Sequence, residues 1–131
     1  MPTSTASTLE FQRWADSIPW ATVAPEAVAF ALNLYEAPGE WHAEFVGCAR
    51  FDPDDSDWAC SEVFAAREPV FVLSHLHAGS TWKKALKTFG GLLRTYLQSD
   101  SPGARRLSAA EAVAFGFVDG DLKLIQKTTS A

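Results

Sequence analysis

The amino-acid sequence predicts an α+β fold, in which a mainly antiparallel sheet of about five strands packs against helices. Three observations carry this prediction. Apolar residues alternate with a period of two between residues 27 and 51. Residues 81–97 follow a helical period. Near the C-terminus, Asp119-Gly120 separates two apolar runs, which is a strong hairpin signal.

The size and composition of the chain suit a single domain. A chain of 131 residues with 47% hydrophobic residues can bury its own core. We expect this domain to span residues 9–128, after a flexible polar N-terminus, residues 1–8. No segment approaches the ~20 apolar residues of a membrane span, and the start of the chain lacks signal-peptide features. The sequence therefore predicts a cytoplasmic protein, in which Cys48 and Cys60 are reduced and buried.

The first elements are a short helix and a hairpin. Thr8 is placed to cap a short helix that runs to Asp16, and Pro19 ends it. Residues 27–34 alternate as a strand, and residues 41–51 alternate as the returning strand. Between them Pro38-Gly39 supplies a turn, because proline presets φ and glycine accepts a positive φ. These patterns predict an antiparallel pair.

The middle of the chain predicts a helix and then a strand. Asp57 is placed to cap a helix over residues 58–67, with Val63 and Phe64 facing inward. After Pro69, residues 70–73 are apolar on both faces, which favours a central strand.

The strongest helical pattern covers Thr81–Leu97. Its apolar side carries Trp82, Leu86, Phe89, Leu93, Tyr96 and Leu97, and its basic side carries Lys83, Lys87 and Arg94. Gly90-Gly91 interrupt the basic side, where each glycine costs about 1 kcal/mol relative to alanine. Close approach by a neighbour, either inside the chain or from a partner such as a second copy, would account for this loss, and a merely solvated face is the alternative.

The remaining segments complete the predicted order α-β-β-α-β-α-β-β. Residues 99–103 are rich in Ser, Asp, Pro and Gly and predict a loop. Residues 112–118 and 121–127 form the second hairpin around Asp119-Gly120.

The densest charge cluster lies between Phe51 and Trp58. Within the six residues 52–57 there are four aspartates, Asp52, Asp54, Asp55 and Asp57. Such a run is tolerated as a solvated loop and is stabilised by a cation or a basic partner. As a calcium loop it is a poor match, because Asp57 stands where a glycine is required and Val63 stands where a bidentate acid is required. A solvated loop and a recognition surface for a basic partner both remain open.

The histidines support an alternative interpretation. His75 and His77 share one face if the preceding strand continues through them, and His42 could join them. Such a set could bind zinc or act as a general acid–base pair, as in a small histidine- or metal-dependent hydrolase. A lone His-x-His is more often a pair of partly exposed strand-end residues. No nucleophile elbow, phosphate-binding glycine loop or His-Glu-x-x-His motif is present, so no catalytic residue, metal ligand or cofactor is assigned.

Charge is distributed unevenly along the chain. Residues 1–82 contain twelve acidic and three basic residues, whereas residues 83–131 contain four acidic and eight basic ones. A bipolar molecule results if the fold keeps these charges apart. The net charge of −5 argues against non-specific nucleic-acid binding, which depends on basic surface.

Two segments carry a family resemblance: residues 41–64, with the aspartate loop, and Val113-Ala114-Phe115-Gly116-Phe117-Val118-Asp119-Gly120-Asp121-Leu122. Over residues 41–125 the chain resembles the immunity proteins, small acidic bacterial proteins encoded beside polymorphic or contact-dependent toxins. The resemblance implies a cytosolic inhibitor that binds its cognate toxin, often a basic nuclease domain, through acidic surface. It rests on general pattern and transfers no functional residue by position.

The leading hypothesis is a protein-binding module that is a monomer or a homodimer and contacts neither nucleic acid nor membrane. The predicted contact residues are Asp52, Asp54, Asp55 and Asp57, with Trp41 or Trp58 as an aromatic anchor if exposed.

Overall fold

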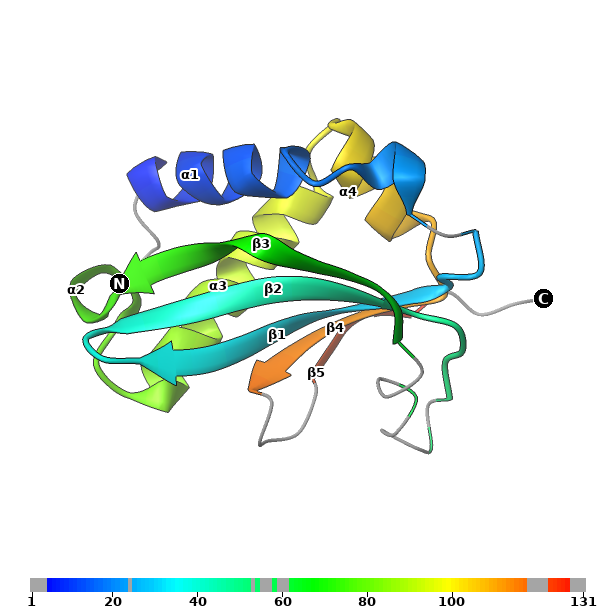
Figure 1. Ribbon diagram of the computed structural model, residues 1–131. Coiled ribbons are helices and arrows are strands. Elements are labelled where there is room, and N and C mark those ends of the chain that lie inside the picture. The colour runs from blue at the N-terminus through cyan, green and yellow to red at the C-terminus, as the bar shows by residue number, and fades with distance from the viewer. Residues whose placement is uncertain are drawn as a thin grey trace.

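Five strands form one sheet, with the helices packed against one of its faces (Figure 1). This architecture comes from a computed structural model that describes residues 5–23, 25–52, 54, 58, 62–117 and 123–127. The elements are α1 (Thr5–Asp16), η1 (Trp20–Thr22), β1 (Ala29–Ala37), β2 (Glu40–Cys48), β3 (Glu62–Ser74), α2 (His75–Ala78), α3 (Trp82–Leu97), α4 (Pro102–Ser108), β4 (Ala112–Phe117) and β5 (Lys123–Lys127). The predicted α+β class is confirmed.

The strand order is β3-β2-β1-β4-β5. Neighbouring strands are antiparallel except β1 and β4, which are parallel. Both predicted hairpins are confirmed as the pairs β1–β2 and β4–β5. In the first, Gly39 has a φ of 74°, the conformation that the Pro38-Gly39 turn requires. The turn at Asp119-Gly120 lies outside the described residues.

The helix predicted over residues 58–67 is wrong from residue 62 onward. Residues 62–67 instead begin β3, a strand of 13 residues that pairs with β2. The register shifts so that Ala66 and Phe71 oppose two positions of β2 that are only two residues apart. Pro69 lies in this irregular stretch, where an edge strand tolerates its missing N–H.

Other predictions also differ from the structure. The first helix begins at Thr5 and not at Thr8, so residues 5–8 of the predicted flexible N-terminus belong to α1. The segment 70–73 belongs to an edge strand, not a central one, and Val72 is exposed. The strand ends at Ser74, whose side chain caps α2, so His75 and His77 lie on a helical turn. The predicted loop at 99–103 contains the start of α4, which Ser101 caps with Pro102 in the first turn.

The main core lies between the sheet and the helices. Phe30, Leu32 and Leu34 of β1 meet Phe11 of α1 and Phe89 of α3 there, and each is fully buried. A smaller apolar cluster covers part of the opposite face of the sheet and contains Ala29, Ala31, Val46, Cys48, Trp58, Ala112 and Ala114. Small residues on one face and large residues on the other therefore explain why the helices pack on one side only.

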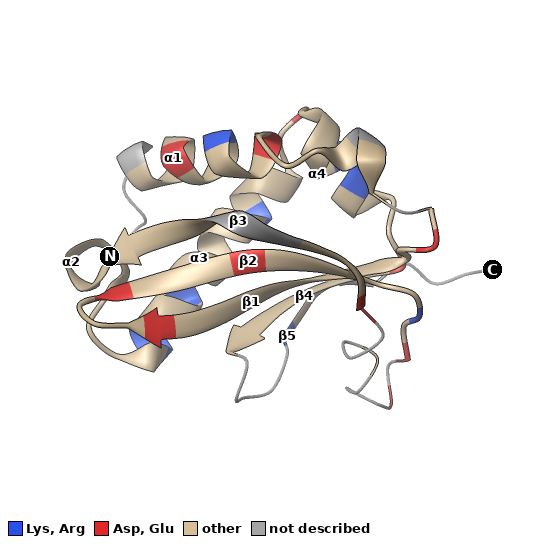
Figure 2. Cartoon of the chain, viewed as in Figure 1, with Lys and Arg blue, Asp and Glu red and all other residues tan. Residues whose placement is uncertain are grey.

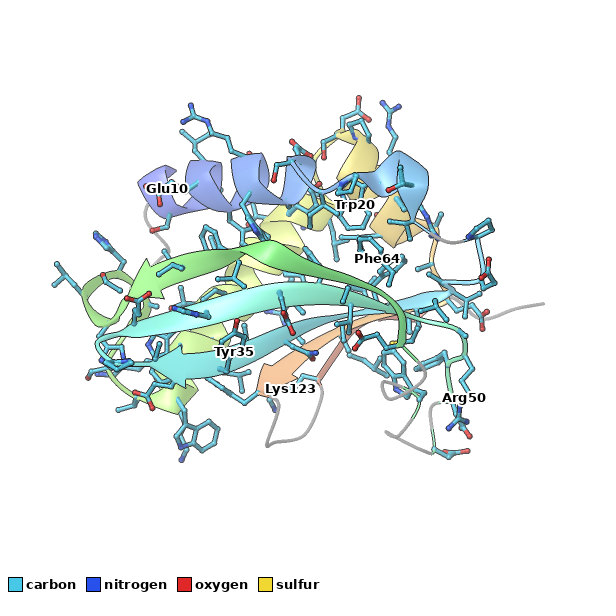
Figure 3. All side chains as sticks on the ribbon, in the orientation of Figure 1. Glu10, Trp20, Tyr35, Arg50, Phe64 and Lys123 are labelled. Atoms are coloured by element: carbon cyan, nitrogen blue, oxygen red, sulfur yellow. The ribbon has the colours of Figure 1, made fainter. Side chains whose placement is uncertain are left out.

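Polar contacts tie the helical layer together. The Tyr96 hydroxyl donates a hydrogen bond to Asp16, across 2.7 Å, and so joins α3 to the end of α1. Trp20, which lies between the helices and the sheet (Figure 3), donates from its ring nitrogen to the Ala15 carbonyl at 2.8 Å. The Arg106 guanidinium donates to the Ala27 carbonyl at 2.8 Å and lies over the Phe30 ring.

The packing of α3 against β4 explains why a glycine occupies position 90. A Cβ atom at this position would lie 2.7 Å from Cζ of Phe115 on β4. Close approach by a neighbour inside the chain, one of the two predicted causes, is therefore confirmed for Gly90. The helix passes so near the sheet here that only glycine fits without a shift of the ring.

Candidate functional site

The aspartate loop leaves the sheet at the end of β2 and returns before β3. Asp52 is half-buried and Asp54 is exposed. The Asp52 carboxylate accepts a hydrogen bond from the Asp54 backbone N–H at 2.9 Å, the geometry of an Asx turn. Asp55 and Asp57 lie outside the described residues.

Two aromatic rings hold the ends of this loop together. The rings of Phe51 and Trp58 meet edge to face with centroids 5.3 Å apart. Trp58 is only 3% exposed and belongs to the smaller apolar cluster on the sheet. The sequence between the rings carries four negative charges. Both ends of the acidic segment are therefore fixed to the sheet.

Neither tryptophan is an exposed anchor. Trp41 is 2% exposed, and its ring nitrogen donates to the Gly79 carbonyl at 2.8 Å. Its ring packs against Phe117 and His75. The condition attached to the predicted anchors, that they be exposed, is not met for Trp41 or Trp58. Both side chains instead position the segments around them.

The histidines are placed apart by the sheet. His42 points to the face opposite the main core, where its ring meets that of Tyr35 and its Nε2 lies 2.8 Å from Glu40. His75 packs on Trp41, on the helix-covered side, and its Nε2 lies 3.3 Å from a Glu36 carboxylate oxygen. Among the described residues, no group of three His, Cys, Asp or Glu is placed to hold a metal ion.

Sequence reasoning missed the acidic character of the β1–β2 hairpin. Glu36, Glu40 and Glu44 all lie on it, and Figure 2 shows them in red along the hairpin. Burial and the Glu44 carboxylate raise the pKa of Tyr35, which lies on β1 (Figure 3). The signal was present in the sequence, because these glutamates recur at every fourth position, but it was spread over two strands and both faces of the sheet.

Four of the eleven cations lie on α3, namely Lys83, Lys84, Lys87 and Arg94. A groove of about 410 Å³ runs between this helix and the β4–β5 pair. Its lining consists of Trp82, Lys83, Leu86, Lys87, Gly90, Arg94, Phe115 and Lys123. Figure 2 shows the blue positions along α3, one of which lies next to the red end of β1 in this view.

Comparison of the chain with protein families, with curated proteins and with solved structures found no match. Among the described residues, no helix combines the length and apolar character that crossing a membrane requires.

Proposed function

We propose that this chain is a cytoplasmic protein-binding module of the immunity type, which inhibits a basic toxin domain through its acidic surface. The observation that carries the proposal is the attachment of the aspartate loop. Phe51 and Trp58 contact each other on either side of the four aspartates, and Trp58 is buried against the sheet, which ties both ends of the acidic sequence to the domain. Fixing the ends reduces the ordering cost that a partner must meet on binding.

The acidic residues would act mainly on the rate of association. Exposed carboxylates such as Asp54 steer a basic partner during diffusion and raise the association rate constant. At 0.1 M salt the Debye length is about 10 Å, so this attraction weakens as salt increases. The inhibitory step itself is occlusion of the partner's active surface, which needs no catalytic group on this chain.

The alternative from the sequence, a histidine- or metal-dependent hydrolase, requires His42, His75 and His77 to act together. The sheet separates His42 from His75, and His77 is exposed on α2. No described contact favours that function, and we propose only the binding function.

The proposal is tested with the products of the genes that flank this one. Each is expressed in a bacterial host alone and together with this chain. A flanking product that stops growth alone and is tolerated in the presence of this chain supports the proposal. If no flanking product is toxic, or if toxicity is unchanged by this chain, the immunity function is wrong.

The role of the loop is measured by stopped-flow association with that toxic product. Changing the four loop aspartates to Asn should slow association at least about tenfold at low salt, and the difference should shrink at high salt. A matched control removes the same charge from exposed sites elsewhere, namely Glu10, Glu26, Asp100 and Glu111. Equal slowing in both variants would show that net charge, not the loop, steers the partner.

A further inference from the structure

The groove beside α3 combines an apolar floor with a cationic rim. Phe115 and Leu86 form the floor, and Trp82 stands at its edge with 56% of its surface exposed. Trp82 is the single exposed tryptophan of the five in the chain, since the other four are buried. Gly90 contributes to the hollow, because it places no side chain between the helix and Phe115.

The cations of α3 oppose the stability of the helix that carries them. Its sixteen residues include four cations and no acid. Lys83 and Lys84 lie in the first turn, where the helix dipole favours acidic residues. Lys83 and Lys87 are four residues apart, a spacing at which like charges repel. No ion pair of the described residues involves Lys83, Lys87, Arg94 or Lys123. An anionic ligand would relieve this repulsion.

The rim is long, which limits what fits it. Lys83 and Arg94 are eleven residues apart on one helix, or about 16 Å at 1.5 Å per residue. That distance matches about five residues of an extended chain at ~3.3 Å each. A small inorganic anion would engage only part of the rim. A short acidic segment contacts the groove alone, whereas a nucleic acid extends along the surface and meets the acidic remainder of a chain whose net charge is −5.

We propose that this groove binds an extended acidic segment of a protein partner. Its carboxylates pair with Lys83, Lys87, Arg94 and Lys123, and one apolar side chain of the segment rests on the floor formed by Leu86 and Phe115. The groove is a binding surface separate from the aspartate loop. It binds an acidic segment, whereas the loop is proposed to bind a basic partner. Asp119 and Asp121, between β4 and β5, lie outside the described residues.

A second copy of this chain is a less suitable occupant. Its aspartate loop would supply the acidic segment, but a loop-into-groove contact joins two different surfaces. Unless the rotation closes into a ring, such contacts extend into open filaments. An acidic segment of another protein is therefore the better occupant of the groove, and the test below also detects self-association.

The test uses fluorescein-labelled peptides and fluorescence anisotropy at low salt. The first probe is the six-residue peptide Glu-Asp-Phe-Glu-Asp-Glu, and the others replace its Phe with Gly or its acids with Gln. Octathymidylate serves as the nucleic-acid probe. We expect the first peptide to bind at micromolar concentration, the Gly peptide to bind at least fivefold more weakly, and the Gln peptide and octathymidylate not to bind.

Charge-matched variants locate the binding. In K87Q/R94Q the Kd of the first peptide should rise at least tenfold. In K84Q/R105Q, which removes two exposed cations that do not line the groove, it should change less than twofold. Binding should also protect Trp82 from quenching by acrylamide, a change that Trp82→Phe removes.

Four results would overturn the proposal. These are the absence of peptide binding, equal losses in the two double variants, tighter binding of octathymidylate than of the peptide, and concentration-dependent self-association by light scattering that K87Q/R94Q abolishes. Circular dichroism of each variant establishes that the fold is kept. All outcomes are independent of the toxin experiment, since no flanking gene product is used.

Discussion

Replacing Gly90 with Ala sets two effects of known sign against each other. Removing a glycine from a helix interior stabilises by about 1 kcal/mol. The new methyl group, however, would lie 2.7 Å from Cζ and 3.0 Å from Cε2 of Phe115, so the ring must shift. Phe115 is only 4% exposed, and overpacking a core typically costs about 1–3 kcal/mol. We expect a net loss of about 1 kcal/mol, with a larger loss for Gly90→Leu.

Urea unfolding of a double-mutant cycle isolates this contact. Phe115→Leu removes the ring atoms that the methyl would meet. In that background, Gly90→Ala should be neutral or stabilising, which gives a coupling free energy of at least about 1 kcal/mol. In the wild-type background the thermal midpoint should fall by roughly 3–5 °C. If Gly90→Ala instead stabilises the protein by about 1 kcal/mol in both backgrounds, helix α3 does not press against β4 and the reasoning is refuted.

Three further outcomes follow from buried side chains. Burial and the hydrogen bond to Asp16 raise the pKa of Tyr96 above its ordinary value of 10.0, so the folded state holds this proton more tightly than the unfolded state. The contribution of Tyr96 to the free energy of unfolding is therefore fully present below pH 10. It is lost as the pH rises above 10, by up to about 1.4 kcal/mol per pH unit. Alkaline urea titrations should show a smaller loss in Tyr96→Phe, and an equal loss would contradict the assignment. Trp58→Ala should destabilise by about 3–5 kcal/mol in urea, whereas the exposed Trp82→Ala should change stability by less than about 0.5 kcal/mol; similar effects at both sites would contradict the burial of Trp58. Gly103→Ala places a methyl group against the Tyr96 hydroxyl and should cost about 1–3 kcal/mol, so an unchanged thermal midpoint would exclude that close packing.

Elements with strong local signals were predictable from the sequence. Residues 81–97 have a complete helical period, and α3 begins and ends within one residue of the prediction. Both hairpins carry turn residues between alternating runs, and both are present. In these segments propensity, period and tertiary contacts agree, so local reasoning suffices.

The segment 62–67 shows where local reasoning fails. Asp57 resembles a helix cap, and the Ala and Glu residues that follow favour helix. Pairing with β2 supplies backbone hydrogen bonds on both sides of the irregular stretch and outweighs that weak preference. The capping signal of Ser101-Pro102 was also present, but a helix as short as α4 is not distinguishable from a loop by period.

The site depends on strand order, which the sequence does not encode locally. Trp41 and Trp58 were candidates for exposed anchors because nothing nearby in the sequence covers them. Trp41 is covered by Phe117, and Trp58 by the sheet face that includes Ala112 and Ala114. Those partners lie more than fifty residues further along the chain. The predicted basic side of α3 was correct in its charges, but its groove exists only because β4 lies beneath Gly90.

The parallel pairing of β1 with β4 sets the order in which the chain can fold during synthesis. Strands β1, β2 and β3 are available once residue 74 has been made, whereas β4 begins at residue 112 and ends at residue 117. At 5–20 residues per second, about 40 residues take roughly 2–8 s. Throughout that interval one edge of β1 is open, with Phe30, Leu32 and Leu34 beside it. If the ribosome pauses in this interval, the three-stranded meander of β1, β2 and β3 exposes an unpaired, apolar strand edge. A chain released before residue 112 would keep this edge, to which other chains can pair.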